Sequence, residues 1–502
     1  MFSMFKMNFK TFAKALGRSM AHALVASPLL FAALPAFAEY NQAGIPDSAE
    51  IRTRVQQEWL EQPYAALKGK AAEHSTDAIG NLFEIRMEDS AEGEAATEYA
   101  IIVCPETYSQ TEFIDGENRQ VQKIPHYYKD SAGSWILYKE KASGKPLRIE
   151  WHFSYDEDVY LMFVPSGHKT FANLIVCSYY AARSVPLGID FKNLYTMSFQ
   201  EVYNLTKKPL PWYKVDFSNN DYTEVKKMIA IIRQKLPSLK YAENAACDER
   251  DNVLNILTGA PYKKEEVDYS ALLRNAPAPT ESEDDSKLLL GEDGFVKWIV
   301  DGIIRSVTGQ NSSLAEMLEP TDILDSAPAV TQQNKFSAAN KKRTLDLCRN
   351  LAAKAFVVRS PRGIRAKSGG SKNDDWKKFG VDVNVEPFVS RLVTPSKAEN
   401  TAGYVEGTGY SVDELRGMLY VLACTEPGWF YIGAIREPAI KENTMKFNHC
   451  AAFFSYFDSN RRLVCRVFQK GEVLSLEDFI KKYPKCFVHL ERVKSFPYFK
   501  PY

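Results

Sequence analysis

Three side chains in the C-terminal part of the sequence could do chemistry together. Glu292 and Asp293 stand directly before the apolar run Gly294–Val307, and His449 lies in a strand-like run much later in the chain. Histidine changes its charge near neutral pH, and an acid is stabilised at the positive end of a helix. Any chemistry therefore depends on whether the start of the apolar run and the histidine meet in the folded chain.

The apolar run that follows the two acids is predicted to be a buried helix. Its polar residues Lys297, Asp301 and Arg305 recur at i, i+4 and i+8, and one thin polar stripe is typical of a helix buried on most sides. A buried helix that precedes a small antiparallel sheet is an α+β arrangement. The expected later elements are helices at Lys341–Phe356 and from Ser411, strands at Trp429–Ile435, His449–Phe457 and Leu463–Gln469, a short helix from Ser475, and a strand at Cys486–Val493.

This order of parts resembles the NlpC-type papain-like cysteine peptidases, which cut bacterial cell-wall peptides. In that family an Asp-Cys-Ser-Gly-Phe-Val motif opens the buried helix. Here Gly294, Phe295 and Val296 match the motif, and Glu292 stands where the nucleophilic cysteine is expected. The resemblance covers roughly residues 285–495, with a long insert before the histidine strand. It implies a papain-like α+β domain.

The resemblance also implies roles for two residues of the expected strands. His449 matches the family's histidine strand, where the imidazole is the base and a polar residue on the partner strand orients it. If Asp458–Arg461 is the hairpin turn, Gln469 or Lys470 lies across from His449. Gln469 is then the expected orienting residue, although a slip of one residue changes the pairing.

The acid at position 292 decides the functional expectation. A carboxylate is a weak nucleophile toward an amide, and Cys450 does not easily replace the missing thiol because adjacent strand residues point to opposite faces. We therefore expect a vestigial site of Glu292, His449 and Gln469 that binds cell-wall peptide or another envelope ligand without cleaving it. The alternatives are a cell-wall endopeptidase or amidase with an atypical nucleophile, and a plain surface or adhesion protein.

A simpler interpretation of the same residues is also open. Glu292 and Asp293 can serve only as helix caps, and His449 can be a partly buried strand histidine that is bonded to a neighbour. The histidines form no HExxH motif or comparable metal spacing. The sequence therefore predicts no metal and no cofactor.

The beginning of the chain predicts export. Residues 1–38 combine a basic head without acids, the apolar run Leu24–Leu34 and the small-x-small pattern Ala36-Phe37-Ala38, which together are typical of a secretory signal peptide. The expected location is the periplasm or the extracellular space, with no transmembrane segment after signal removal and with peptidoglycan or another envelope polymer as partner. The formal net charge of zero gives no indication of nucleic-acid binding.

The N-terminal part is predicted to be β-rich. Turn residues separate short β-forming runs at Leu82–Met87, Tyr99–Val103, Trp135–Lys139, Leu147–Phe153, Val159–Val164 and Phe171–Tyr180. Such spacing indicates an antiparallel meander, packed as a β-sandwich or a half-barrel. The expected organisation is a signal peptide at 1–38, a helical segment at 39–80, the β-rich domain at 81–190, a second helical segment at 191–275, an acidic Pro-rich linker at 276–286 and the papain-like domain at 287–502.

The chain of 502 residues contains eight cysteines and no CxxC pair. Export permits one or two disulfides, which the sequence does not pair. The alternative is that most of the cysteines are small buried hydrophobic residues.

Overall fold

The computed structural model describes most of the chain after the expected signal peptide. The described residues are 44–90, 97–115, 118–263, 287–321, 341–360, 375–389, 392–394, 397–398, 403–438 and 446–502. The predicted signal peptide at 1–38 and the predicted linker at 276–286 lie outside these ranges.

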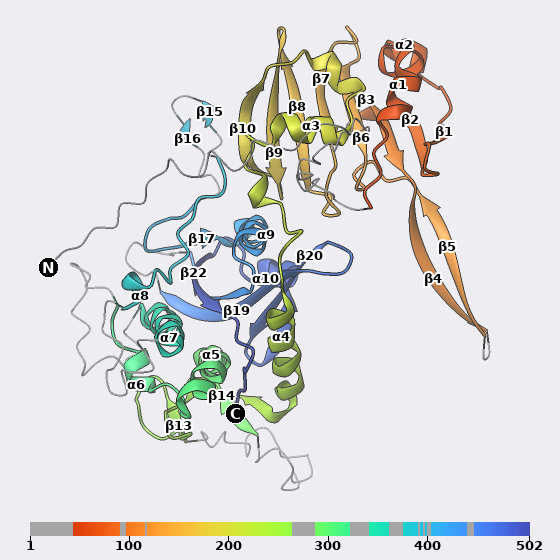
Figure 1. The fold of residues 1–502 in the computed structure, drawn as a ribbon. Coiled ribbons are helices and arrows are strands. Elements are labelled where there is room, and N and C mark those ends of the chain that lie inside the picture. The colour runs from red at the N-terminus through yellow and green to blue at the C-terminus, as the bar shows by residue number, and fades with distance from the viewer. Residues whose placement is uncertain are drawn as a thin grey trace, which may run out of the picture. The chain divides into compact units, whose positions relative to one another are not determined.

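The N-terminal part contains one large antiparallel sheet, which follows helix α1 (Ala49–Val55), a π-helical turn (Gln56–Leu60) and α2 (Tyr64–Leu67). The strand order β1-β2-β3-β6-β7-β8-β9-β10 is that of a meander. Strands β4 and β5 form a separate two-stranded hairpin (Figure 1). The strands are β1 (Glu73–Thr76), β2 (Leu82–Ser90), β3 (Glu98–Pro105), β4 (Thr107–Asp115), β5 (Asn118–His126), β6 (Trp135–Glu140), β7 (Pro146–Trp151), β8 (Val159–Ser166), β9 (Lys169–Val176) and β10 (Tyr179–Leu187).

Two details of this sheet differ from the sequence prediction. The single strand expected at Phe171–Tyr180 is two strands, because Cys177 and Ser178 both adopt a positive φ and turn the chain. The sheet also packs on helices instead of on a second sheet. The guanidinium of Arg52 in α1 lies over the rings of Trp135 and Trp151. Helical segments therefore cover the apolar face that a sandwich would bury against strands.

The segment after this sheet is helical for only part of its length. A 3-10 helix (Phe191–Tyr195) precedes α3 (Phe199–Thr206), which begins with the capping box that the sequence Ser198-Phe199-Gln200-Glu201 predicts. Another 3-10 helix (Trp212–Lys214) leads to α4 (Thr223–Lys235), which is followed by a 3-10 turn (Leu236–Ser238). Helix α4 buries the apolar stripe that its sequence predicts, which consists of Val225, Met228, Ile229 and Ile232.

Within the segment 191–275 the sequence predicts a helix at Asp251–Leu257, before Gly259 and Pro261, and this prediction is wrong. Strands β12 (Ala245–Cys247) and β13 (Val253–Asn255) form a short antiparallel hairpin there. The side chain of Asp248 accepts hydrogen bonds from the backbone N–H groups of Arg250 and Asn252. Local bonds of this kind offer the backbone a turn in place of a helix.

The C-terminal part is an α+β arrangement around a six-stranded antiparallel sheet in the order β17-β22-β18-β19-β20-β21. Its strands are β17 (Tyr410–Ser411), β18 (Trp429–Arg436), β19 (Phe447–Phe457), β20 (Leu463–Gln469), β21 (Glu472–Ser475) and β22 (Phe487–Lys494). The other elements are the parallel pair β11 (Leu239–Tyr241) and β14 (Leu288–Leu290), the pair β15 (Leu392–Thr394) and β16 (Lys397–Ala398), and helices α5 (Glu292–Thr308), α6 (Leu314–Met317), α7 (Arg343–Arg359), α8 (Asp375–Lys378), α9 (Leu415–Thr425, after a 3-10 turn at Val412–Glu414) and α10 (Leu476–Lys482).

Alternating residues of β19 divide the helices between two layers. Phe454 belongs to the core that the sheet shares with α4, α5 and α7. On the opposite face, Phe453 packs on Phe479 of α10 and Phe457 packs on Tyr420 of α9. Helix α5 is therefore held against the sheet, and its first turn lies close to the beginning of β19.

Candidate functional site

The start of α5 is fixed by two glycines. Gly291 is the N-cap residue, and its N–H donates to the carbonyl of Ala245 at 2.6 Å. A Cβ on Gly294 would fall on that same carbonyl oxygen, well inside van der Waals contact. The Gly-Phe-Val match in the sequence thus has a local reason, because the backbone that leads into β12 crosses directly over the first turn of α5.

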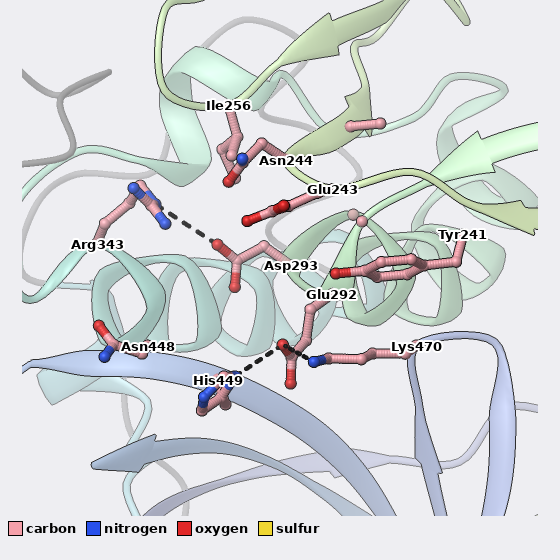
Figure 2. Close-up of a pocket in the computed structure, with 13 residues that line it drawn as sticks. Tyr241, Glu243, Asn244, Ile256, Glu292, Asp293, Arg343, Asn448, His449 and Lys470 are labelled. Carbon is pink, nitrogen blue, oxygen red and sulfur yellow. Dashed lines mark hydrogen bonds and ion pairs between the residues drawn. The ribbon is translucent and has the colours of Figure 1, made fainter. Parts of the chain in front are cut away.

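Glu292 is the first residue of α5, and its carboxylate is directed at the sheet. His449 Nδ1 donates to Glu292 Oε2 at 2.9 Å, and Lys470 Nζ lies 3.4 Å from Oε2 (Figure 2). Gln469 Nε2 donates to Oε1 at 2.6 Å. No side-chain hydrogen bond caps the helix at Gly291. Glu292 is therefore more than a helix cap, because its partners are three side chains from β19, β20 and the residue after β20.

This contact favours the charged form of His449. The hydrogen bond to Glu292 raises the pKa of the imidazole, against the opposing effect of its partial burial. The second ring nitrogen, Nε2, lies 3.4 Å from Oε1 of Glu437. A protonated imidazole cannot accept a proton, so a contact that favours protonation of His449 opposes the base role that the peptidase resemblance implies.

Gln469 reaches the site but does not pair with His449 as expected. The β19–β20 ladder joins Phe457 to Leu463 and ends at Ala452 and Phe468. The turn is thus one residue longer than the one predicted at Asp458–Arg461, and this changes the register. The amide of Gln469 donates to Glu292, to the Cys450 carbonyl and to Tyr483 Oη, so it positions the acid instead of the imidazole.

Asp293 forms a second buried cluster beneath the first. Its Oδ1 accepts from the Thr344 hydroxyl at 3.2 Å and from Cys450 Sγ at 3.3 Å, and its Oδ2 lies 3.5 Å from Arg343 Nε. Burial raises the pKa of Asp293 and raises the pKa of the Cys450 thiol well above its ordinary value. Cys450 is thus a protonated, fully buried thiol and not a replacement nucleophile.

All eight cysteines of the chain are buried free thiols in the structure. No disulfide joins any two of them. Their burial agrees with the expectation that most of the cysteines are small buried hydrophobic residues.

A small cleft of about 120 Å³ lies between the first turn of α5, the backbone that enters β12, the start of α7, the start of β19 and the residue after β20 (Figure 2). The described residues that line it include no Cys, Ser or Thr. They are Tyr241, Glu243, Asn244, Ala245, Ile256, Gly291, Glu292, Asp293, Gly294, Arg343, Asn448, His449 and Lys470.

One group of side chains in the described residues has a composition that can hold a metal ion. Asp382, His489 and Glu491 each offer a ligand atom, and these atoms lie within 4.8 Å of one another. Arg349 already occupies this cluster, since its guanidinium donates to both carboxylate oxygens of Asp382 at 3.1 and 2.8 Å. His489 Nδ1 donates to Glu491 at 2.8 Å, and Tyr404 Oη lies 3.1 Å from Nε2. A divalent cation would have to displace Arg349.

The sequence analysis did not find this cluster. His489 and Glu491 are two residues apart on β22, and this spacing places both side chains on one face of the strand. That is the only local signal, because Asp382 and Arg349 come from distant segments.

The fold and the site define a mixed α+β protein with a charged cleft at the start of a buried helix. Residues 41–214 match the model of a family described as a domain of unknown function (DUF8515). This match runs from before α1 through the eight-stranded sheet to the 3-10 helix after α3. No curated protein and no solved structure matches the chain.

Within the described residues, no helix has both the length and the apolar character needed to cross a bilayer.

Proposed function

We propose that the C-terminal part is a papain-like domain of the NlpC type that has lost its nucleophile and binds a cell-wall peptide without cleaving it. The observation that carries this proposal is the 2.9 Å contact between Glu292 Oε2 and His449 Nδ1. An acid occupies the position of the expected cysteine at the helix start, and the histidine of the resemblance is its partner. Export by the segment at 1–38 would bring this cleft to the bacterial envelope.

The chemistry of the pair supports binding over cleavage. Peptide cleavage by the papain route needs a thiol that passes its proton to an imidazole and attacks as the thiolate. Here the imidazole is bound to a carboxylate that favours its protonated form. The only cysteine in contact with the site, Cys450, is buried and has a raised pKa.

Sedimentation with purified cell wall tests the proposal. The protein is expected to pellet with the wall and to release no peptide into the supernatant. An Asn448→Trp variant should lose binding, because Asn448 is an exposed residue that lines the cleft. Asn460→Trp is the matched control, since Asn460 is an exposed asparagine in the turn between β19 and β20.

Two results would overturn the proposal. Release of peptides that stops in a His449→Ala variant would show an active hydrolase with an atypical nucleophile. Failure to pellet, or equal pelleting of the two Asn→Trp variants, would remove the cleft from wall binding and leave a surface protein of another kind.

A further inference from the structure

One arginine of the cleft has a guanidinium nitrogen without a hydrogen-bond partner in the described part of the chain. Arg343 begins α7, and its side chain is only 14% exposed. Its Nε is buried without a hydrogen-bond partner in the described part of the chain. Its ion-pair partner Asp293 has Oδ2 at 3.5 Å from Nε, which is beyond a good hydrogen bond. A guanidinium in such a place can still receive a carboxylate through two parallel hydrogen bonds.

The other charges of the cleft restrict what can bind beside Arg343. Glu292 is neutralised by His449 and Lys470. Glu243 is exposed and forms no hydrogen bond or ion pair with a described residue, and Figure 2 shows its carboxylate directed toward the side of the cleft where Arg343 and Asp293 lie. A simple anion at Arg343 would be repelled by this acid. A ligand with an ammonium group next to its carboxylate would satisfy both residues.

We infer that the cleft takes the zwitterionic head group of an α-amino acid, with the carboxylate on Arg343 and the ammonium group facing Glu243. The volume agrees with this class: about 120 Å³ is the room of about four water molecules. The inference rests on the proposed function, which places the ligand of the protein in this cleft. It adds the chemical class of that ligand.

Titration of the full chain with small probes tests the inference. The probes are L-alanine, D-alanine, acetate and ethylammonium, each followed by isothermal titration and by the shift in melting temperature. One or both alanines are expected to bind, with acetate and ethylammonium at least about 10-fold weaker, because each of them satisfies only one charge. Equal binding of acetate, or no binding of either alanine up to about 50 mM, would overturn the inference.

Three variants locate the two ends of the ligand. Arg343→Gln should weaken alanine binding by about 10- to 100-fold, and Arg343→Lys by less, because lysine keeps the charge but not the two parallel bonds. Glu243→Gln should also weaken it, and this exposed position tolerates the change if Arg343→Gln fails to fold. Arg233→Gln, on the exposed side of α4, is the control that keeps full affinity. Unchanged alanine affinity in Glu243→Gln contradicts the inference. Unchanged affinity in both Arg343→Lys and Arg343→Gln also contradicts it.

The wall-sedimentation assay separates this inference from the proposed function. If wall binding survives in Arg343→Gln, the amino-acid head group is not what the cleft recognises, and the proposed function stands. If alanine binds in an Arg343-dependent way but the protein does not pellet with cell wall, the head-group site stands and the wall ligand is wrong.

Discussion

Replacement of Glu292 by glutamine is expected to weaken the fold in a pH-dependent way. The change keeps the size of the side chain and removes its charge. In the structure the Glu292 side chain is 11% exposed, and its carboxylate receives hydrogen bonds from His449 and Gln469. A hydrogen bond to a charged group contributes about 1.5–3 kcal/mol. We expect a loss in the lower half of that range, because His449 is 26% exposed and an amide oxygen still accepts one bond.

The direction of the pH dependence follows from the histidine. Glu292 raises the pKa of His449 in the folded protein. The stabilisation by the charged imidazole is therefore complete below its unfolded value of about 6.5 and is lost as the pH rises through the raised folded value. The difference in unfolding free energy between the wild type and Glu292→Gln should be larger at about pH 6 than at about pH 9.

Urea unfolding at the two pH values measures this difference, and the NMR titration of His449 gives its midpoint in each protein. The midpoint should fall in Glu292→Gln. Glu472→Gln, at an exposed glutamate of β21, serves as the control and should leave both quantities unchanged. An equal difference at both pH values, or an unchanged His449 midpoint, would refute the idea that Glu292 favours the charged form of the imidazole.

Three further changes test the surroundings of the site. Glu292→Cys should give a thiol that reacts with iodoacetamide faster than an ordinary thiol of pKa about 8.5, because a helix start and the neighbouring imidazole both favour the thiolate; a normal rate would place the site elsewhere. Gly294→Ala should lower the unfolding free energy by about 1–3 kcal/mol in urea titration, since the new methyl group meets the carbonyl of Ala245; a neutral change would show that the crossing backbone moves away at no cost. Arg349→Met should cost about 3–5 kcal/mol in the same assay, because Asp382 and its buried neighbours lose their cation; a stabilised variant would contradict the assigned role of the arginine.

The strongest sequence signals were those with a clear period or a local cap. The polar stripe at Lys297 and Asp301 predicted a buried helix, and in α5 these two residues form a buried ion pair at 2.5 Å. The capping box at Ser198 also predicted the start of α3. Both signals are local, so the rest of the fold cannot easily override them.

The features that sequence reasoning missed depend on backbone geometry or on distant segments. The turn at Cys177 uses residues that rarely adopt a positive φ, so an uninterrupted strand was the natural prediction. The predicted register of Gln469 failed because one extra residue in a turn changes every pair beyond it. Arg343 and Glu243 were not among the predicted site residues, because neither stands near a motif and the fold alone brings them to the cleft.

The carboxylate at the beginning of α5 is attached to the chain that forms its own binding site. Its local concentration there is in the millimolar range or above and cannot be diluted. Dissolved acetate or phosphate would have to compete with a partner that never diffuses away. Dissolved anions should therefore not displace Glu292 from His449 and Lys470. The position available to an anionic ligand is Arg343, on the other side of the cleft.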